Sequence, residues 1–503
     1  MAAAFAALAL LAAGDWPHQQ ALAIGAPGAV TEFAAGANLA PDILQPRPSF
    51  TFYVARDGND NWSGTLKAPS NGNGPFATVA RARDAIRALK AGGRLAGPVS
   101  VQIRAGTYYL QTPLVLTPLD SGTPSGPISY QSYPGETAVL SGGQPIRGWR
   151  RLGDGERSDV SAAAHGSIWV ADVPRGTIFN NLFINGSPLT RSAMPATTDW
   201  RTWPRATPAR GVVDGFFFSP GAFPSYSDAA SAEVNVVPFI GSHAVNFLEP
   251  VARLDFSSGM IAFSPNARPY EPMKVTNGAY FRVENILGAL TGPGQWSLDA
   301  ARGKVYCWPP AGVSLNAAEV TAPHLRMAID LRGSEDQGLV RFINFSGLTI
   351  AYFDRARRDE PFPPSPKVRL IWAETQDSAI LMRGVEDCSI QRCRITDVGG
   401  MGVRATHHAS RIRIVNNQIN NCGGSAIAFE GYEPGIHDVN RDDLIARNTI
   451  YHCAQSSWRG SAITLLQAGN ITVADNRISD LPYCGIFVSG YPLSYFRVYK
   501  PGA

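Results

Sequence analysis

Three acidic residues in the last quarter of the chain have types and positions that could support acid–base chemistry: Glu430, Asp397 and Asp480. Hydrolysis of a glycosidic bond commonly uses two carboxyl groups, one protonated to supply a proton and one ionised to act as base or nucleophile. Glu430 begins a long polar segment, and we expect it to pair with Asp397 or Asp480. The alternative is that each Asp is a turn residue whose side chain bonds its own backbone.

Five further side chains near these carboxylates are candidates for binding a substrate: Arg404, His407, Tyr432, His452 and Trp458. A guanidinium and an imidazole can bind hydroxyl groups or a carboxylate, and His452 is placed to hydrogen-bond with Asp480. The indole of Trp458 could stack on a sugar ring, or it could anchor the loop that contains it.

A sequence repeat identifies the elements that must position these residues. Isoleucine recurs at separations of 24, 31 and 28 residues, at Ile395, Ile419, Ile450 and Ile478. An apolar column precedes it by five places: Ile390, Ile414, Ile445 and Val473. Another follows a little later: Val403, Ile427, Ile463 and Ile486. Two places before the isoleucine, the repeat carries Cys393, Asn417, Asn448 and Asn476.

A period in the twenties with several matched columns is typical of a solenoid. The units contain short β segments and tight turns, so the sequence predicts coils of a parallel β-helix that stack about 4.8 Å apart. The apolar columns fill the interior, and the Asn column forms a ladder of mutually bonded buried amides. Asp397 and Asp480 share a column three coils apart, about 14 Å, and so do not form a catalytic pair with each other. Arg404 and Glu430 are predicted to point outward on one strand face.

Two insertions lengthen the repeat, at residues 429–443 and 454–459. Insertions in solenoids collect on one face, which is often the binding face. The first insertion carries Tyr432 and the second carries Trp458, which is why both are expected to lie near a substrate.

The chain has six cysteines, at Cys307, Cys388, Cys393, Cys422, Cys453 and Cys484. None forms a Cys-x-x-Cys pair, which argues against a zinc or thioredoxin site. Cys422 and Cys453 share one inward column and are predicted to stack as small apolar side chains. A disulfide between neighbouring coils is the alternative.

The remaining sequence divides into recognisable segments. An apolar run followed by Ala21-Leu22-Ala23 predicts a signal peptide over 1–23, with an Ala-rich leader as the alternative. A linker over 24–48 follows. Residues 49–150 are predicted to form the first coils, with an amphipathic helix over 75–90 capped by Thr78. Residues 151–340 are interpreted as an inserted β-rich module, 341–490 as further coils, and 491–503 as an irregular tail that could mark a truncated chain.

Composition limits the classes of function. The 503 residues carry 44 basic and 40 acidic side chains, a formal net charge of +4, without a dense basic stripe. Nucleic-acid binding is therefore disfavoured, whereas an acidic polysaccharide would be tolerated. No segment is long and apolar enough to span a bilayer. We expect a monomer with no cofactor and no bound metal.

The stretches FYVARDGNDNWSGT, GPFATVARARDAIRAL, VSVQIRAGTYYL and ISDLPYCGIFVSG resemble bacterial right-handed parallel β-helix proteins with a pectate-lyase-like fold. The resemblance is strongest to glycoside hydrolase family 141 and its uncharacterised relatives, and it covers most of residues 50–490. It implies a secreted or periplasmic glycoside hydrolase acting on a plant or microbial oligo- or polysaccharide. Members of that group continue for several more coils beyond the point where this chain ends.

Two other functions remain open. A polysaccharide lyase would use a carboxylate-bound Ca²⁺ and a basic residue, and the adjacent Asp442 and Asp443 are the acidic pair considered for it. Because neighbours on a strand face opposite ways, this pair is a poor calcium site. A non-catalytic carbohydrate-binding protein is the third interpretation.

Overall fold

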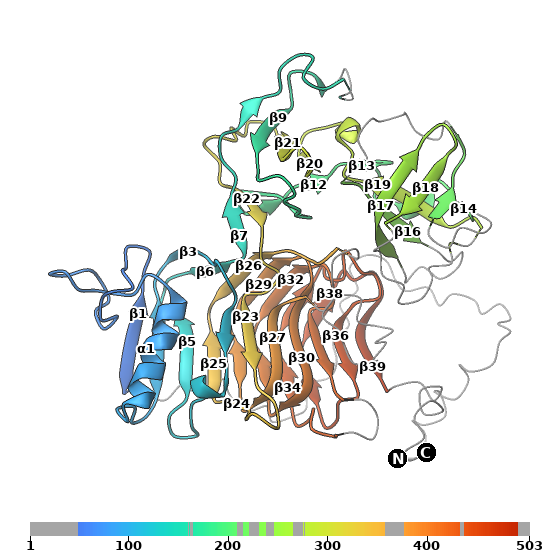
Figure 1. The fold of residues 1–503 in the computed structure, drawn as a ribbon. Helices are drawn as coiled ribbons and strands as arrows, with labels where there is room; N and C mark the ends of the chain where they lie inside the picture. Colours follow the sequence, from blue (N-terminus) through green and yellow to red (C-terminus); the bar gives the residue numbers. More distant parts are fainter. Residues whose placement is uncertain are drawn as a thin grey trace, which may run out of the picture.

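The computed structural model describes residues 49–158, 160, 164–208, 215–220, 231–237, 246–264, 275, 277–357, 377–432 and 437–490. The predicted signal peptide, linker and tail lie outside these residues. In the described part, the chain winds through three parallel sheets in turn, and each sheet runs the length of the stack (Figure 1). This is the predicted parallel β-helix.

The three sheets are here named I, II and III in the order in which each coil visits them. Sheet I contains β1 (Phe50–Val54), β2 (Val99–Ile103), β5 (Ile128–Ser132), β25 (Ile343–Ser346), β28 (Ser389–Gln391), β31 (Arg413–Val415), β34 (Leu444–Ala446) and β37 (Thr472–Ala474). Sheet II contains β3 (Gly106–Tyr109), β6 (Ala138–Ser141), β26 (Thr349–Phe353), β29 (Arg394–Val398), β32 (Gln418–Cys422), β35 (Thr449–Tyr451) and β38 (Arg477–Ser479). Sheet III contains β4 (Leu114–Leu116), β23 (Ile329–Arg332), β27 (Ser378–Glu386), β30 (Met401–Ser410), β33 (Ile427–Glu430), β36 (Ser461–Leu466) and β39 (Cys484–Ser489), and β24 (Val340–Arg341) pairs with β27.

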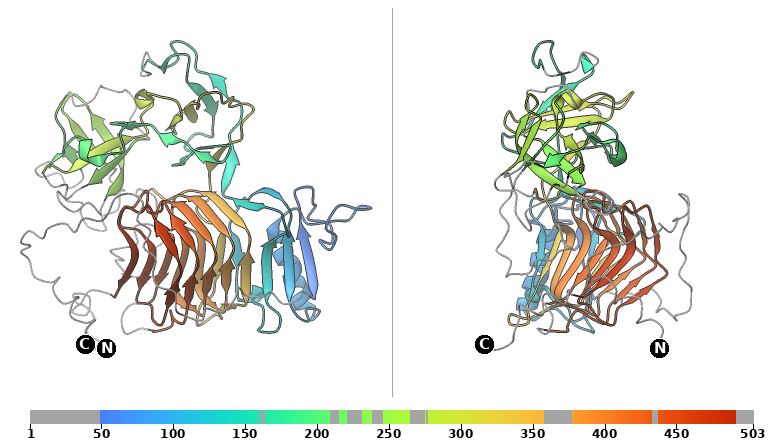
Figure 2. Two further views of the ribbon diagram at one scale, coloured as in Figure 1. Left: turned by 180° about the vertical axis from the view of Figure 1, so that it is seen from behind. Right: turned by 90° about the vertical axis from the view of Figure 1, so that its right-hand side faces the viewer.

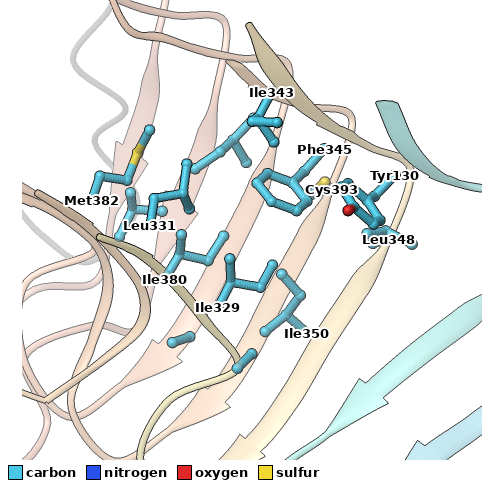
Figure 3. Packing of buried hydrophobic residues seen from close by; sticks show 14 of the residues in the cluster. Tyr130, Ile329, Leu331, Ile343, Phe345, Leu348, Ile350, Ile380, Met382 and Cys393 are labelled. Carbon is cyan, nitrogen blue, oxygen red and sulfur yellow. The ribbon is translucent and has the colours of Figure 1, made fainter. Parts of the chain in front are cut away.

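The register of these strands confirms the predicted apolar columns. Ile390 pairs with Ile414, Ile414 with Ile445, and Ile445 with Val473 in sheet I. The second column is in register in sheet II, and the third in sheet III. Side chains from all three sheets point into one core, as Figure 3 shows for Ile329, Phe345 and Ile350. Burying each such side chain contributes about 1.5–3 kcal/mol.

The Asn column forms the expected ladder. Asn417 Nδ2 donates to Asn448 Oδ1 and Asn448 Nδ2 donates to Asn476 Oδ1, each at 2.9 Å. The same amides also reach backbone carbonyls, such as that of Ile414 at 2.9 Å from Asn448 Nδ2. The ladder therefore pairs the polar groups of a bend that has no room for water.

The cysteines are all free thiols. Cys422 and Cys453 are fully buried one coil apart, as predicted for small core side chains, and they form no bridge. Burial and the neighbouring Cys453 thiol raise the pKa of Cys422 well above its ordinary value.

The early helix is present as α1 (Val79–Ala91), and the Thr78 side chain accepts a hydrogen bond from the backbone N–H of Arg81. Its buried face joins the same core as the coils, through Val79, Ala82, Ala85, Ile86 and Leu89. The helix lies at the N-terminal end of the stack (Figure 1), where it covers apolar side chains of the first coils. A short 3₁₀ helix, η1 (Pro118–Asp120), follows β4.

The inserted module is built from three further sheets. The first contains β7 (Gly143–Pro145), β22 (Val320–Pro323), β10 (Phe183–Ile184) and β11 (Ser187–Pro188). The second contains β8 (Arg150–Arg151), β9 (Trp169–Asp172), β21 (Lys304–Trp308), β20 (Gln295–Asp299) and β12 (Thr190–Arg191). The third contains β13 (Ala193–Met194), β19 (Tyr280–Glu284), β16 (Glu233–Val237), β17 (Phe247–Asp255), β18 (Met260–Phe263), β15 (Gly215–Phe217) and β14 (Thr207–Pro208). Two 3₁₀ helices, η3 (Trp200–Thr202) and η4 (Leu287–Ala289), lie between these strands.

The module is shorter at its C-terminal end than the predicted 151–340. It leaves the coils at β7 and returns at β22, because β23 already belongs to sheet III and pairs with β4 and β27. The chain leaves the coils at Gly142. A larger residue does not fit at this position, because its Cβ atom would lie 2.3 Å from the Phe353 ring. The sequence shows no simple period up to residue 340, so it does not separate residues 329–340 from the module. The module lies along one side of the stack (Figure 2).

The Asn ladder can be tested with Asn448→Ala. This change leaves buried partners on Asn417, Asn476 and Ile414 without their hydrogen bonds, and each unpaired buried group costs about 1–3 kcal/mol. We expect the free energy of unfolding to fall by at least about 2 kcal/mol, measured by urea denaturation. The exposed Asn61→Ala is the matched control, with an expected change within about 0.5 kcal/mol. Equal effects of the two substitutions would contradict a structural role for the ladder.

Candidate functional site

The outer face of sheet III presents the side chains that the sequence placed there. Val403 and Ala405 in β30 point into the core. Side chains alternate along a strand, so the intervening Arg404 and the following Thr406 point outward. The same alternation in β33 turns Glu430 outward. Register pairs Thr406 directly with Glu430, so Arg404 and Glu430 lie diagonally across neighbouring strands, within reach of each other.

Arg404 and Glu430 form a buried ion pair. Arg404 donates to Glu430 Oε2 from Nε at 2.9 Å and from a terminal nitrogen at 2.5 Å. The two residues are only 5% and 2% exposed, so each charge depends on the other for compensation. Both bonds end on Oε2, which leaves Oε1 of Glu430 without a hydrogen-bond partner among the described residues. That oxygen keeps its lone pairs available.

A second carboxyl group on this face was not found from the sequence. Asp377 stands directly before β27, and the backbone N–H of Ala356 donates to its Oδ2 at 2.5 Å. Burial raises the pKa of Asp377, although Arg326, Arg355 and Arg404 act in the opposite direction. Arg404 is bonded to Glu430, and its charge acts on Asp377 only from a distance, since Asp377 lies four residues before Leu381, the register partner of Arg404. Asp377 precedes the repeating region, so no column pointed to it.

Asp397 occupies a bend at the end of β29, where the backbone is left-handed with φ of 56°. Thr396 Oγ1 donates to Asp397 Oδ2 at 2.9 Å, and Asn421 Nδ2 donates to Oδ1 at the same distance. Burial raises the pKa of Asp397. Every residue of this column has positive φ, including Asn421, His452 and Asp480, which matches the alternative interpretation of these residues as turn residues.

Asp480 and His452 form the hydrogen-bonded pair expected for neighbouring coils, with His452 Nδ1 at 2.7 Å from Asp480 Oδ2. Both side chains are exposed, and they lie at the bend between sheets II and III. Glu430 lies at the opposite end of the sheet III strand, and β33 alone spans about 10 Å. The structure therefore does not bring Asp397 or Asp480 beside Glu430. Asp377 lies beside Gly400 at the start of the sheet III strands, so the partner that the structure gives Glu430 is Arg404.

Aromatic side chains form a row next to Glu430. The Tyr432 ring meets the His407 ring edge-on at 5.0 Å, and the His437 ring at 5.2 Å. His437 Nε2 lies 3.5 Å from Glu335 Oε2, which connects the first insertion to the turn after β23. His407 and Tyr432 thus lie together at one end of the outer face, where the sequence expected substrate contacts.

His408 lies deeper in the same region, with Nδ1 2.9 Å from Glu335 and Nε2 3.1 Å from Glu386. Glu386 also pairs with Arg341 and Arg411, and together with His408 these groups lower its pKa against the opposing effect of burial. This network is saturated with partners and serves to hold the turns together.

Trp458 is an anchor between the coils and the module. Its backbone N–H donates to Asn246 Oδ1 at 2.9 Å, and Asn246 Nδ2 donates to Ser456 O at 3.2 Å. The indole lies 6.3 Å from the ring of Trp203 in the module. Of the two interpretations offered for Trp458, the loop anchor is the one that the described contacts support.

The same junction contains further buried charges. Arg355 donates to both oxygens of Glu233, at 3.2 and 2.6 Å, and Arg191 also pairs with Glu233. Asp354 accepts bonds from the backbone and side chain of Asn180, and burial raises its pKa to about 6. These contacts fix the module against the coils beside Asp377.

The acidic pair considered for calcium is separated in the structure. Asp443 is 2% exposed and accepts a bond from the Ile412 backbone N–H at 2.7 Å, whereas Asp442 is partly exposed and pairs with Arg441. Burial raises the pKa of Asp443 to about 8. Within the described ranges, no three His, Cys, Asp or Glu side chains are grouped as metal ligands. Those residues therefore do not supply the cluster that a calcium-dependent lyase needs.

In the described part, no helix is long and apolar enough to cross a bilayer.

Comparison with known proteins identifies the architecture. The family model for a right handed beta helix region matches residues 375–497. The fold is a right-handed parallel β-helix. A solved structure titled "Glycoside hydrolase" is similar to this β-helix, with a TM-score of 0.72 and 21% identity over 88% of this chain and 80% of that one.

A second solved structure, titled "The complex structure of XylC with xylose", has a TM-score of 0.48 and 15% identity, and covers 88% of this chain and 60% of that one. No curated protein matches the chain. At these identities the likeness establishes a glycoside-hydrolase-like β-helix fold and not the reaction. The predicted placement in family 141 stays a prediction.

The buried ion pair can be tested with Arg404→Met. Removing one member of a buried pair leaves an uncompensated charge on Glu430, which typically costs about 3–5 kcal/mol. Arg383→Met is the control, because Arg383 is exposed on the adjacent strand of the same face and has no ion-pair partner among the described residues. We expect the free energy of unfolding, measured by urea denaturation, to change little in Arg383→Met. The double variant Arg404→Met with Glu430→Leu should recover part of the stability that Arg404→Met loses. Equal stability of the two single variants would contradict the buried pair.

The Asp443 carboxyl predicts an unusual pH dependence. Its pKa is 3.8 in an ordinary environment and about 8 in the fold, so the folded state holds the proton more tightly. Stability from this group is complete below about pH 4 and is lost progressively as pH rises toward 8. Asp443→Asn should remove that loss. The free energy of unfolding of this variant, measured by urea denaturation, should exceed that of the parent by a margin that grows between about pH 5 and about pH 8. Asp442→Asn, as control, should keep the parent's dependence; an Asp443→Asn profile parallel to the parent's would contradict the buried carboxyl.

Proposed function

We propose that this protein is a glycoside hydrolase that acts on an oligo- or polysaccharide along the outer face of sheet III. The observation that carries the proposal is the buried carboxylate of Glu430, which Arg404 fixes through Oε2 while Oε1 stays available. Fold likeness to a structure titled "Glycoside hydrolase" supports the same class of chemistry. The apolar N-terminal run supports a secreted or periplasmic location.

The two carboxyl groups suit different roles. Burial raises the pKa of Asp377, which favours the protonated form that a general acid needs. Its Oδ2 is occupied by the Ala356 N–H, while its Oδ1 has no hydrogen-bond partner among the described residues and can carry a proton. Asp377 is thus a candidate acid at the start of the sheet III strands, about 20 Å along the strand direction from Glu430, so the two carboxyl groups do not act together on one glycosidic bond.

Glu430 suits the role of base or nucleophile. Arg404 fixes its carboxylate through Oε2, and Oε1 remains available to activate water or to attack an anomeric carbon. The row of His407 and Tyr432 begins directly beyond Glu430 and would contact the neighbouring sugar. In this arrangement Arg404 is a positioning residue, because it acts on substrate through Glu430.

The proposal predicts loss of activity in Glu430→Gln and in Asp377→Asn. General acid–base groups contribute about 10²–10⁴-fold in rate, and we expect losses of that order in reducing-sugar release from a panel of soluble polysaccharides. Asp480→Asn is the matched control, since it removes an exposed carboxylate at another bend. Melting curves must show that each variant remains folded, and Glu430→Asp provides a variant that keeps the charge opposite Arg404.

The pH profile tests the role of Asp377. Activity should fall at high pH as Asp377, whose pKa burial raises, loses its proton. Asp377→Asn should remove the high-pH limb from whatever activity remains. Wild-type turnover in Glu430→Gln would refute the assignment. An unsaturated product absorbing in the ultraviolet would instead indicate a lyase, and binding without cleavage would indicate a non-catalytic carbohydrate-binding protein.

A further inference from the structure

An open cavity of about 400 Å³ lies on the module, at the ends of β8, β9 and β21. Its walls include the two half-buried indoles of Trp169 and Trp308, with Arg151, Ser167 and Ser314 at polar positions. These strands lie in the upper part of the module, above the coil stack (Figure 1). The cavity is therefore separate from the outer face of sheet III.

The cavity is held in shape by short-range contacts. Arg151 pairs in register with Trp169, and its guanidinium lies 5.3 Å from the Trp169 ring centroid. Trp308 is followed by Pro309 and Pro310, whose restricted backbones limit the motion of this wall. The Val313 N–H donates to Pro310 O at 3.1 Å and closes the turn. A preformed wall reduces the entropy that a ligand must overcome.

The chemistry of the walls fits a sugar ring. Indoles offer flat apolar surfaces for the C–H face of a pyranose, and Trp169 and Trp308 are each packed against the core of the module while part of each side chain stays accessible at the cavity. The Ser167 and Ser314 hydroxyls have no hydrogen-bond partner among the described residues and can bond to sugar hydroxyls. The volume lies within the usual range for small-ligand sites, about 300–1,000 Å³.

We propose that this cavity is a second carbohydrate-binding site, which holds a polysaccharide chain on the module while sheet III carries out the reaction. It takes a neutral sugar unit, because its polar groups are hydroxyls and the Arg151 charge is engaged with Trp169. The inference goes beyond the hydrolase proposal, since binding here needs no carboxylate of sheet III.

The test is native gel electrophoresis of the full chain through soluble xylan, β-glucan or galactomannan. Trp169→Ala and Trp308→Ala should each weaken retardation by about tenfold in apparent dissociation constant, the effect of losing one good contact. Trp200→Ala is the control, because Trp200 meets the Tyr280 ring edge-on elsewhere in the module. Trp308→Phe should retain most of the binding, which distinguishes a stacking role from a structural one.

Hydrolysis of a short soluble glycoside should be unchanged in the Trp variants, and Glu430→Gln should still be retarded by the polysaccharide. A parent protein that shows Trp-dependent retardation but cleaves no glycoside tested would refute only the hydrolase proposal. The second site is overturned if none of the three polysaccharides retards the parent. It is also overturned if Trp169→Ala is retarded as strongly as the parent.

Discussion

The fold depends on one constraint: each coil must offer the next coil the same hydrogen bonds and the same side-chain shape. Parallel pairing at about 4.8 Å places equal positions of successive coils in direct contact. An isoleucine therefore needs an apolar neighbour above it, and a buried Asn needs another Asn at the same bend. The ladder from Asn417 to Asn476 satisfies this requirement with side-chain and backbone bonds together. The two insertions lie at the other two bends of the coil, so the added residues leave the ladder intact.

The outer face of sheet III obeys the same register with different chemistry. Alternation along the strand requires that a residue between two buried neighbours points outward, and Arg404 and Glu430 do so on adjacent strands. Removing both charges from water is costly unless they meet. They meet through one oxygen of Glu430, so the pair stabilises itself and still leaves an oxygen available for chemistry.

The module is attached to the coils by contacts between distant segments of the chain. Its contacts with the coils are polar and buried: Glu233 with Arg355, Asn180 with Asp354, and Asn246 with the loop of Trp458. Arg355 also influences the ionisation of Asp377. The residues that attach the module therefore contribute to the environment of a candidate catalytic acid.

The sequence by itself determined the coils, because their repeat is a direct consequence of stacking. The columns of Ile419, the Asn ladder, the helix with its Thr78 cap and the outward direction of Glu430 all follow from local periodicity. Only the tertiary structure decided the partner of Glu430. Asp397 shares a polar pattern with later coils but lies at another bend, whereas Arg404 meets Glu430 diagonally across neighbouring strands. The role of Trp458 was also undecided, since its contacts come from Asn246 and Trp203, more than two hundred residues earlier. Periodicity reports which way a side chain points, but contacts between distant segments depend on how the insertion folds back, and no local pattern encodes that.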